Sequence, residues 1–594
     1  MIDLKTYLTK KGFVVLLAFL SLGYFSHAQY MEFEWSDEYR FSNRKTGFFT
    51  EFIGANQTSV YLLQRNISKS KPYDNSKVKI IALNRNSMAQ DTMVSIKGYP
   101  ENESMASTLD ELDFVTSVVA DGRVLVFWRK LINTNTTRTE EIYGQVFKAD
   151  LQPATKILKV FAYKQDVKDH PSVYDPTMCV VLTDENSDHL VLGTERFNEG
   201  NLEFYYATFS SGLATNKTGV VPLPQKADSY PGQLTSDYEL KENKLFIRST
   251  VDYTKEEKIE LLPRRVDHFP AFTLADLATQ RSTSIELRGA ELSITDFSYQ
   301  TFGNSTRVIG FFGDFSEDTT GTDKHGLFYA DIDHESFEAS EVKYISFDRS
   351  TLNRLFPKKR MRKREKEGID EDELLASRFD IEHIEAMSDN SLVLFFTREY
   401  NHTESDTRSN LSGENVYQFD HFYKKKDIFA MRLSEAGEIM WSRSLERMIT
   451  YQGEDVSDLR VVYKYDEFFV LYGNEDAELK PPSNRKKHRH LTEELEYAIF
   501  NPSSGRGKVY TTEVNEPKTD PKDKQYLDPN SATIVDGQVL FYTMNIRQNP
   551  LWIAANIICL PTLYYTAVSG NTKQAKAQFT TMHIRDGKRP RKRR

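Results

Sequence analysis

An acidic tract between residues 313 and 326 is the first candidate for ion chemistry. It reads GDFSEDTTGTDKHG and carries Asp314, Asp318 and Asp323. Carboxylate oxygens are the ligands that Ca²⁺ prefers, so calcium would be the ion held here. The tract lacks the alternating acids, central glycine and distal glutamate of a calcium loop. Because apolar, strand-like runs flank it on both sides, we interpret it as a connection between two strands and predict no metal site.

Five residues that follow apolar runs form a second set of candidates. They are Arg129, Glu195, Arg196, Glu399 and Tyr400. Carboxylate and guanidinium groups suit sugars or acidic ligands. If the runs are equivalent strands of a repeated unit, these residues line one rim and form a polar ligand-binding site. The alternative is that charges at strand ends are simply solvated. Glycoside hydrolysis would need two carboxylates roughly 5 to 10 Å apart, which a sequence cannot measure.

Motifs for covalent, nucleotide or metal chemistry are absent from the sequence. It contains no nucleophile elbow, HExxH motif, P-loop or dinucleotide fingerprint. Cys179 and Cys559 lie in apolar runs without a CxxC motif, so we expect two buried thiols rather than a disulfide framework or a zinc site. His488 and His490 lie in a basic insertion at 481–494 and are weak candidates for a metal tract. We therefore expect no cofactor, and the sequence leans away from an enzyme.

A strand–turn–strand pattern recurs along the chain and would position the candidate residues. Each copy has Asp, Asn or Gly at the tight turn, where these residues tolerate a positive φ. A third apolar run follows each hairpin, and a fourth closes most units. The hairpins span 47–65, 114–128, 178–195, 233–249, 290–312, 381–396, 458–473 and 531–543.

Four antiparallel strands, repeated about eight times at intervals of roughly 55 to 85 residues, are typical of a β-propeller. We predict an all-β chain whose residues 29–550 form seven or eight four-stranded antiparallel blades with polar loop insertions. The count stays open because strands are hard to place in 251–280. The segment MEFEWSD (31–37) is expected to be an N-terminal strand that completes the last blade. The 38 Phe and 31 Tyr agree with a strand-rich fold.

The N-terminus has the features of a signal peptide. Lysines precede an apolar run at 13–22, and small residues precede a cut after Ala28. We predict that residues 1–28 are removed near Ala28 and that the mature chain is exported to the periplasm or the cell surface. The insertion 357–378, a basic run followed by an acidic run, is expected to be a solvated helix or loop, with a docking arm as the alternative.

The C-terminal residues 551–594 combine an apolar segment with a basic tail. LWIAANIICLPTLYYTAV (551–568) is the most apolar stretch of the mature chain, and RDGKRPRKRR ends the protein. This order resembles a stop-transfer segment, but Pro561 and several polar residues weaken a span that is already short. We favour a buried segment of the last blade, with membrane contact through 551–568 as the alternative.

Two resemblances extend this interpretation. The turn SEAGEIMW (434–441) is similar to the turn of quinoprotein-type propeller repeats, but it occurs once, so no quinone cofactor is implied. The signal segment, FFGDFSEDTTGTDKHGLFYADID, SDNSLVLFFTREY and DIFAMRLSEAGEIMW resemble exported β-propeller-like proteins of the bacterial cell envelope. That resemblance implies a fold and a compartment, and no established activity comes with it.

Three functions agree with these observations. The first is a non-enzymatic binding or scaffold protein of the envelope, because variable polar loops on a rigid framework suit recognition. The second is a glycan-binding or glycoside-active propeller, and the third is a membrane-tethered sensor domain. The expected partner is thus an envelope protein or a glycan. The net charge of −9 argues against nucleic acid, which would require a basic footprint.

Overall fold

Antiparallel strands make up nearly all of the described chain. The structure is a computed structural model that describes residues 31–35, 39–42, 48–66, 74–96, 112–134, 136–166, 179–184, 189–198, 201–226, 237–253, 268–288, 292–314, 326–356, 378–409, 415–452, 459–472, 494–513, 533–535, 538–547 and 574–584. The helix within these residues is α4 (Arg349–Leu355), whose N-terminus is capped by the Asp348 carboxylate accepting from the Thr351 N–H at 2.6 Å.

The strands form eight separate antiparallel sheets, which are the blades of a propeller. Blade 1 consists of β3 (Phe48–Ala55), β4 (Ser59–Asn66), β5 (Asp74–Asn84) and β6 (Gln90–Ile96). Blade 2 consists of β7 (Asp113–Ala120), β8 (Arg123–Asn133), β9 (Thr137–Phe147) and β10 (Leu158–Asp166). Blade 3 consists of β11 (Val180–Thr183), β12 (His189–Asn198), β13 (Asn201–Ser210) and β14 (Thr215–Lys226). Blade 4 consists of β15 (Asp237–Lys241), β16 (Lys244–Asp252), β17 (His268–Asp276) and β18 (Arg281–Glu286).

The second half of the chain repeats the same order. Blade 5 consists of β19 (Leu292–Phe302), β20 (Ser305–Asp314), β21 (Gly326–Asp333) and β22 (Lys343–Ser346). Blade 6 consists of β23 (Arg378–Ala386), β24 (Leu392–Ser409), β25 (Asn415–Leu433) and β26 (Ile439–Gln452). Blade 7 consists of β27 (Arg460–Lys464), β28 (Glu467–Tyr472), β29 (Glu494–Phe500) and β30 (Gly507–Glu513). Blade 8 consists of β31 (Thr533–Val535), β32 (Gln538–Arg547), β33 (Gln574–Ile584) and the N-terminal strands β1 (Met31–Trp35) and β2 (Tyr39–Ser42).

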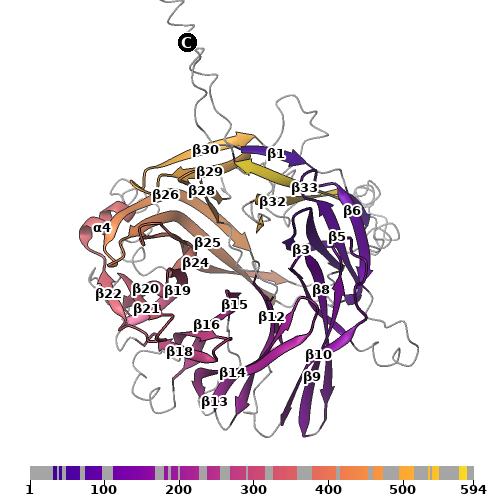
Figure 1. Ribbon diagram of the computed structural model, residues 1–594. Coiled ribbons are helices and arrows are strands. Elements are labelled where there is room, and N and C mark those ends of the chain that lie inside the picture. The colour runs from indigo at the N-terminus through magenta and orange to yellow at the C-terminus, as the bar shows by residue number, and fades with distance from the viewer. Residues whose placement is uncertain are drawn as a thin grey trace, which may run out of the picture.

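The N-terminal strand closes the ring, as predicted for this segment. β1 pairs antiparallel with β33, from Met31 opposite Ile584 to Trp35 opposite Thr580, and β2 continues along the same strand. In Figure 1 the indigo β1 lies beside the yellow β33, so the first and last described strands of the chain pair in one blade. This closure completes the last sheet with a strand from the other end of the chain.

The count of eight settles the question that the sequence left open. Blade 4 is complete: β17 begins at His268, after the long interval that made its strands hard to place. The first strands of neighbouring blades contact one another, as β3 does with β7 and β7 with β11. These first strands are therefore the innermost, and each sheet runs outward from the middle of the ring (Figure 1).

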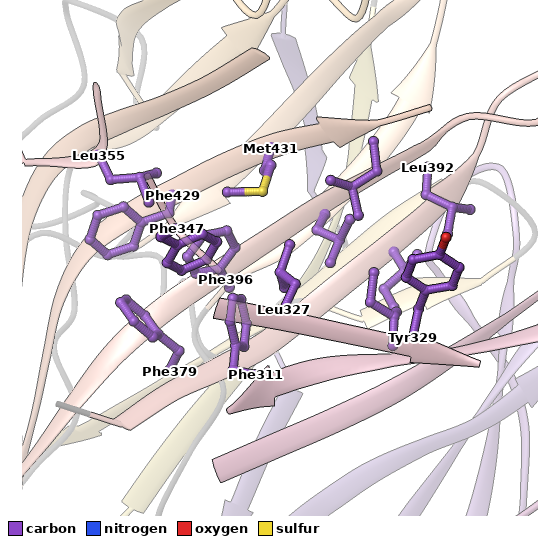
Figure 2. Packing of buried hydrophobic residues seen from close by; sticks show 14 of the residues in the cluster. Phe311, Leu327, Tyr329, Phe347, Leu355, Phe379, Leu392, Phe396, Phe429 and Met431 are labelled. Carbon is purple, nitrogen blue, oxygen red and sulfur yellow. The ribbon is translucent and has the colours of Figure 1, made fainter. Parts of the chain in front are cut away.

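Apolar side chains fill the seams between blades. In the seam between blades 5 and 6, the rings of Phe311 and Phe396 lie 4.7 Å apart, and those of Phe396 and Phe429 lie 5.1 Å apart. Figure 2 shows these rings with Phe379 and Leu355, so α4 covers part of the same cluster. Comparable clusters join blades 1–2, 2–3, 3–4, 4–5, 6–7 and 7–8. Successive side chains of one strand point to opposite faces of the sheet, so they pack alternately against the preceding blade and the following blade.

The two ends of the propeller differ in their connections. Within a blade, the first-to-second and third-to-fourth turns lie at one end, called the short-turn end. The second-to-third connections and the links to the next blade lie at the other, called the long-connection end. At the short-turn end, the turns between the first and second strands span 56–58, 121–122, 242–243, 303–304 and 465–466. Connections at the opposite end include 97–112, 167–179, 253–267, 315–325, 347–377, 473–493, 514–532 and 548–573.

At five seams of the short-turn end, hydrogen bonds run from one blade to a turn of the next. The Tyr61 hydroxyl donates to the Ala149 carbonyl at 3.0 Å, joining blades 1 and 2. The Lys217 ammonium donates to the Ala278 carbonyl at 2.8 Å, joining blades 3 and 4. The Arg281 guanidinium binds the Glu335 carbonyl at 2.7 Å across the next seam. The same seam carries a cation–π contact, with the guanidinium carbon 4.7 Å from the centre of the Phe337 ring.

The pattern continues around blades 5, 6 and 7. The Tyr329 hydroxyl donates to the Ala436 carbonyl at 2.7 Å. Between blades 6 and 7, the Arg432 guanidinium and the Trp441 indole N–H both donate to the Pro502 carbonyl, each at 2.9 Å. These contacts use the third-to-fourth turn of the next blade each time, so the short turns form a rigid, hydrogen-bonded rim.

Candidate functional site

The five candidate residues occupy equivalent second strands, at the part of each strand nearer the long-connection end. Arg129 lies in β8, Glu195 and Arg196 lie in β12, and Glu399 and Tyr400 lie in β24. Blades 2 and 3 are neighbours, whereas blade 6 is separated from them by blades 4 and 5. The structure therefore places the candidates at one end of the ring but in three blades.

Arg129 belongs to a buried group in the seam between blades 2 and 3. Its Nη1 lies 4.0 Å from Oε1 of Glu140, which accepts a hydrogen bond from the Cys179 N–H at 3.3 Å. Burial raises the pKa of Glu140, and the Cys179 N–H and Arg129 partly offset that rise. The Nε of Arg129 is itself buried and has no hydrogen-bond acceptor in the described part of the chain.

Cys179 is a buried thiol, as the sequence predicted for this cysteine. Burial raises its pKa well above the ordinary value, and the Glu140 charge raises it further. A thiol in this state is protonated at neutral pH and does not act as a nucleophile. Cys559 lies outside the described residues.

Glu195 joins blades 3 and 4. The residue is 1% exposed, and its carboxylate accepts a hydrogen bond from the Tyr238 hydroxyl of the next blade. The Tyr238 ring stacks on Phe204 at 4.7 Å. Arg129 and Glu195 therefore face different seams, and the hydrogen bond from Tyr238 to Glu195 links two blades.

The same arrangement recurs in successive seams. Glu140 accepts from the Cys179 N–H, Glu195 from the Tyr238 hydroxyl, Glu239 from the Tyr299 hydroxyl and Asp296 from the Ile381 N–H. In every case the carboxylate belongs to one blade and the donor to the next. Of these four carboxylates, Glu195 was a candidate from the sequence, and Glu140, Glu239 and Asp296 were missed. The available signal was an acidic residue or tyrosine interrupting an otherwise apolar strand.

Arg196 follows Glu195 in β12 and therefore lies on the opposite face of the sheet. It forms an ion pair with Glu203 of β13, and its guanidinium carbon lies 4.5 Å from the centre of the Tyr205 ring. The side chain is 29% exposed. Both partners come from blade 3, so this group is local to one sheet.

Glu399 and Tyr400 lie at the base of a long two-stranded arm. Beyond the body of blade 6, residues 398–409 of β24 pair with residues 415–426 of β25, from Arg398 opposite Lys426 to Ser409 opposite Asn415. The end of β26 pairs with the first part of this arm, up to Gln452 opposite Phe422. The backbone of the arm is described, and the side chains of 398–426 lie outside the description.

Other sequence candidates fall partly or wholly outside the described residues. Asp314 ends β20, and Phe312 pairs with Gly326 of β21, which confirms that the acidic tract connects two paired strands. Asp318, Asp323, His488, His490, the insertion 357–377 and the apolar segment 551–568 lie outside the description. Among the described side chains, no group of three or more His, Cys, Asp or Glu could hold a metal ion. The described helical structure also contains no helix with the length and apolarity to cross a bilayer.

Comparisons with known proteins give no sequence match and only a loose similarity to solved structures. No protein-family model matches the chain, and no curated protein sequence matches it. The chain is similar to prolyl oligopeptidase B from Galerina marginata at 9% identity and a TM-score of 0.33, covering 86% of this chain and 54% of that one, so it spans about half the length of that enzyme.

Two further solved structures are similar at the same low level. The WD40 domain of SCAP from fission yeast matches at 7% identity and a TM-score of 0.31, covering 91% of this chain and 98% of that one. A GH43 endo-arabinanase from Bacillus licheniformis matches at 10% identity and a TM-score of 0.22, covering 50% of this chain and 100% of that one. Superposition this loose carries no functional argument. The eight sheets and their ring closure define the chain as a β-propeller.

Proposed function

We propose that this chain is an exported, non-enzymatic binding or scaffold protein of the cell envelope, which presents its long-connection end to a protein partner. The observation that supports this proposal is the difference between the two ends of the ring. One end has short turns held by hydrogen bonds between blades, and the other carries the long and variable connections. Recognition residues are commonly borne by variable loops on a rigid scaffold.

The seam carboxylates support a binding role over a catalytic one. Glu140 and Glu195 are buried, and each accepts a hydrogen bond from the next blade. A carboxylate used in this way stabilises the assembly of the blades and is not positioned to exchange protons with a ligand. These residues therefore strengthen the framework beneath the long connections.

Export is supported by the order of the N-terminal features and by where the first strand begins. Cleavage after Ala28 would leave the mature N-terminus at Gln29, just before β1 begins at Met31. The strand that closes the ring would then survive removal of the signal peptide. An exported chain that closes its ring in this way agrees with a location in the periplasm or at the cell surface.

Site-specific crosslinking in the native cell tests the proposal. A photo-crosslinking amino acid is placed at Asn133, an exposed residue at the end of β8 on the long-connection end. The matched control places it at Asn86, an exposed residue of the turn 85–89 on the short-turn end. We expect a reproducible protein adduct from Asn133 and none from Asn86. Recovery of the chain alone, or equal adducts from both positions, would contradict the proposal.

A further inference from the structure

The exposed large apolar side chains of the described residues have two main locations. Most lie singly on the outermost strands of separate blades, where isolated apolar side chains are ordinary. Tyr463, Tyr465 and Ile534 instead lie at the inner edge of blades 7 and 8, on or directly after a first strand. Their exposed fractions are 36%, 48% and 37%. Apolar exposure at the inner rim of the described chain is therefore concentrated in two neighbouring blades.

Tyr465 has an unfavourable backbone conformation for its residue type. It is the first of the two residues that connect β27 to β28, and it has a φ of +55°. The equivalent turns of blades 2 and 5 use Asp121–Gly122 and Gly303–Asn304, which are residue types that tolerate a positive φ. A tyrosine at such a position costs free energy, so its presence calls for an offsetting gain.

Burial supplies that gain at the other apolar residues with a positive φ. Met88, Leu151, Leu213 and Phe337 adopt such values in third-to-fourth turns, and their exposed fractions lie between 0% and 9%. Tyr465 has the same kind of conformation with nearly half of its surface exposed. Because strained positions cluster where a protein contacts a ligand, Tyr465 is a candidate contact residue.

Two carboxylates lie close to the neighbouring Tyr463. The Tyr463 hydroxyl donates to Oδ1 of Asp466 at 3.4 Å. Burial raises the pKa of Tyr463, and the charges of Asp466 and of Glu385 from blade 6 raise it further. Both carboxylates are therefore near this hydroxyl, at the inner end of the seam between blades 6 and 7. We call Glu385, Tyr463, Tyr465 and Asp466 the inner-rim patch.

The chemistry of the inner-rim patch favours a cation. The faces of tyrosine rings attract ammonium and guanidinium groups, and carboxylates pair with the same groups. The Lys464 ammonium already lies 5.1 Å from the centre of the Tyr465 ring. Two carboxylates against this one ammonium leave the patch negative. A segment rich in Lys and Arg matches both its charge and its apolar surface, because these side chains carry long apolar stems.

A segment of this kind follows β33 in the same chain. Residues 585–594 read RDGKRPRKRR and contain seven Lys or Arg and one Asp. β33 is the third strand of blade 8, and its last residue, Ile584, lies opposite Met31, the first residue of β1. Because third strands run toward the short-turn end, residues 585–594 follow β33 at the end of the ring that carries the patch.

The distance from β33 to the patch is short compared with the length of this segment. Met582 lies opposite Val539, which lies opposite Ile534, so the exposed Ile534 is two strand spacings, about 10 Å, from β33. Blades 7 and 8 share one core, and packed sheets lie about 10 Å apart. Ten extended residues span up to about 33 Å. The segment is thus long enough to reach the patch across blade 8.

We propose that residues 585–594 dock on the inner-rim patch of the same chain, with Tyr465 as the central contact. Lys and Arg side chains of the segment pair with Glu385 and Asp466 and stack on the exposed tyrosine ring. This contact gives the strained Tyr465 side chain its role. The inference goes beyond the proposed function, because it concerns the other end of the ring and a contact within one chain.

Photo-crosslinking within the purified mature chain tests the inference. The amino acid p-benzoylphenylalanine is placed at position 587, so all seven cations of the segment remain. Dilute protein is irradiated, and mass spectrometry of the digested chain locates the adduct. The test variant is Tyr465→Asn, because asparagine suits the turn and keeps the blade folded. The matched control is Tyr344→Asn, which removes a tyrosine that is 41% exposed on the outermost strand β22.

We expect the adduct to form within one chain and to map to the inner-rim patch. Tyr465→Asn should lower its yield about threefold, and Tyr344→Asn should leave it unchanged. Raising NaCl from about 50 mM to about 500 mM should also lower the yield, because salt screens exposed charges. Four results would each overturn the inference: no adduct with the blades, adducts spread over other blades, adducts that join two chains, or equal effects of the two substitutions. Thermal melting of both variants assigns a changed yield to the patch rather than to unfolding.

Discussion

The short-turn end and the long-connection end of the propeller are built on the same strands, but the two ends use different hydrogen bonds between blades. At the short-turn end, side chains such as Tyr329, Arg432 and Trp441 donate hydrogen bonds to carbonyls in a turn of the following blade. Near the long-connection end, buried carboxylates such as Glu140 and Glu195 accept hydrogen bonds from the following blade. Hydrogen bonds between blades are thus present at both ends of the seams, and the blades differ mainly in the lengths of their connections.

The largest effect in this comparison is expected at a glycine of the short-turn end. Gly437 has a φ of +86°, and a Cβ placed there would lie 2.4 Å from Cε1 of Tyr329. Gly437→Ala combines left-handed strain of about 1–2 kcal/mol with overpacking of about 1–3 kcal/mol. We expect denaturant unfolding to show a loss of about 3 kcal/mol in the free energy of unfolding.

Gly303 is the matched control for this substitution. It has a φ of +54°, and nothing lies within 4 Å of a Cβ built there. Gly303→Ala should therefore cost only the strain, about 1–2 kcal/mol. Equal losses from the two substitutions would show that the Tyr329 ring accommodates the added methyl group at no cost.

Arg432 tests the hydrogen bonds of the same rim. Its guanidinium donates to the Ser391 hydroxyl at 2.8 Å, to the Pro502 carbonyl at 2.9 Å and to the Asp389 carboxylate at 2.7 Å, and the residue is 8% exposed. Arg432→Met keeps much of the volume and removes all three bonds. We expect a loss of about 2–3 kcal/mol in the free energy of unfolding, because hydrogen bonds to a charged group are among the stronger ones.

Arg196 provides the comparison near the other end. Its pair with Glu203 and its contact with the Tyr205 ring stay within one blade, and the side chain is 29% exposed. Arg196→Met should cost about 1 kcal/mol or less, the range of partly solvated pairs. A larger loss at Arg196 than at Arg432 would show that the contacts within one blade contribute more to stability than the hydrogen bonds between blades at the short-turn end.

Carboxylates at the two ends should give opposite pH dependences of stability. Burial raises the pKa of Glu140, so its folded form binds a proton more tightly than the unfolded form does. Stability from this group is complete below the unfolded value of about 4.5 and falls as the pH rises through the raised folded pKa. Hydrogen bonds from Ser391, aided by Arg432, lower the pKa of Asp389, so its contribution is present above the unfolded value of about 3.8 and is lost as the pH falls.

Thermal melting across pH 3 to 8 separates these two groups. Glu140→Gln should remove a decline in stability with rising pH, and Asp389→Asn should remove an increase over the acidic part of the range. Each variant serves as the control for the other, because both replace a carboxylate by its amide. Curves that shift in the same direction for both variants would contradict the assigned environments.

How far the fold follows from the sequence is clear from particular elements. The hairpins 114–128 and 458–473 were predictable because apolar runs flank turns at Asp121–Gly122 and Tyr465–Asp466, where both central residues have positive φ. The ring closure by β1 was also predicted. Blade 4 was uncertain because β16 and β17 are separated by the interval 253–267, and local pattern cannot measure pairing across such a gap.

The candidate residues were harder to predict than the fold. The local sequence pattern was enough to place them in strands, and the structure confirms that these are the second strands of their blades. The partners of Glu140 and Glu195 come from the next blade, many residues away, so burial and pairing depended on tertiary structure. The register of the arm likewise depends on one bulge at Asp427, which strand periodicity alone would miss.

The smallest effect is expected at Tyr465, a turn residue at the inner rim of the short-turn end. Tyr465 and Asp466 have φ values of +55° and +57°, and the tyrosine is 48% exposed. Two-residue hairpin turns of this type favour Asn and Gly, since a bulky side chain is strained there. Tyr465→Asn should raise the free energy of unfolding by about 0.5–1 kcal/mol. The reciprocal change Asn243→Tyr, in the turn where Asn243 has a φ of +63°, should lower it by a similar amount. If Tyr465→Asn instead destabilised the protein, contacts of the exposed ring would outweigh the backbone strain at this position.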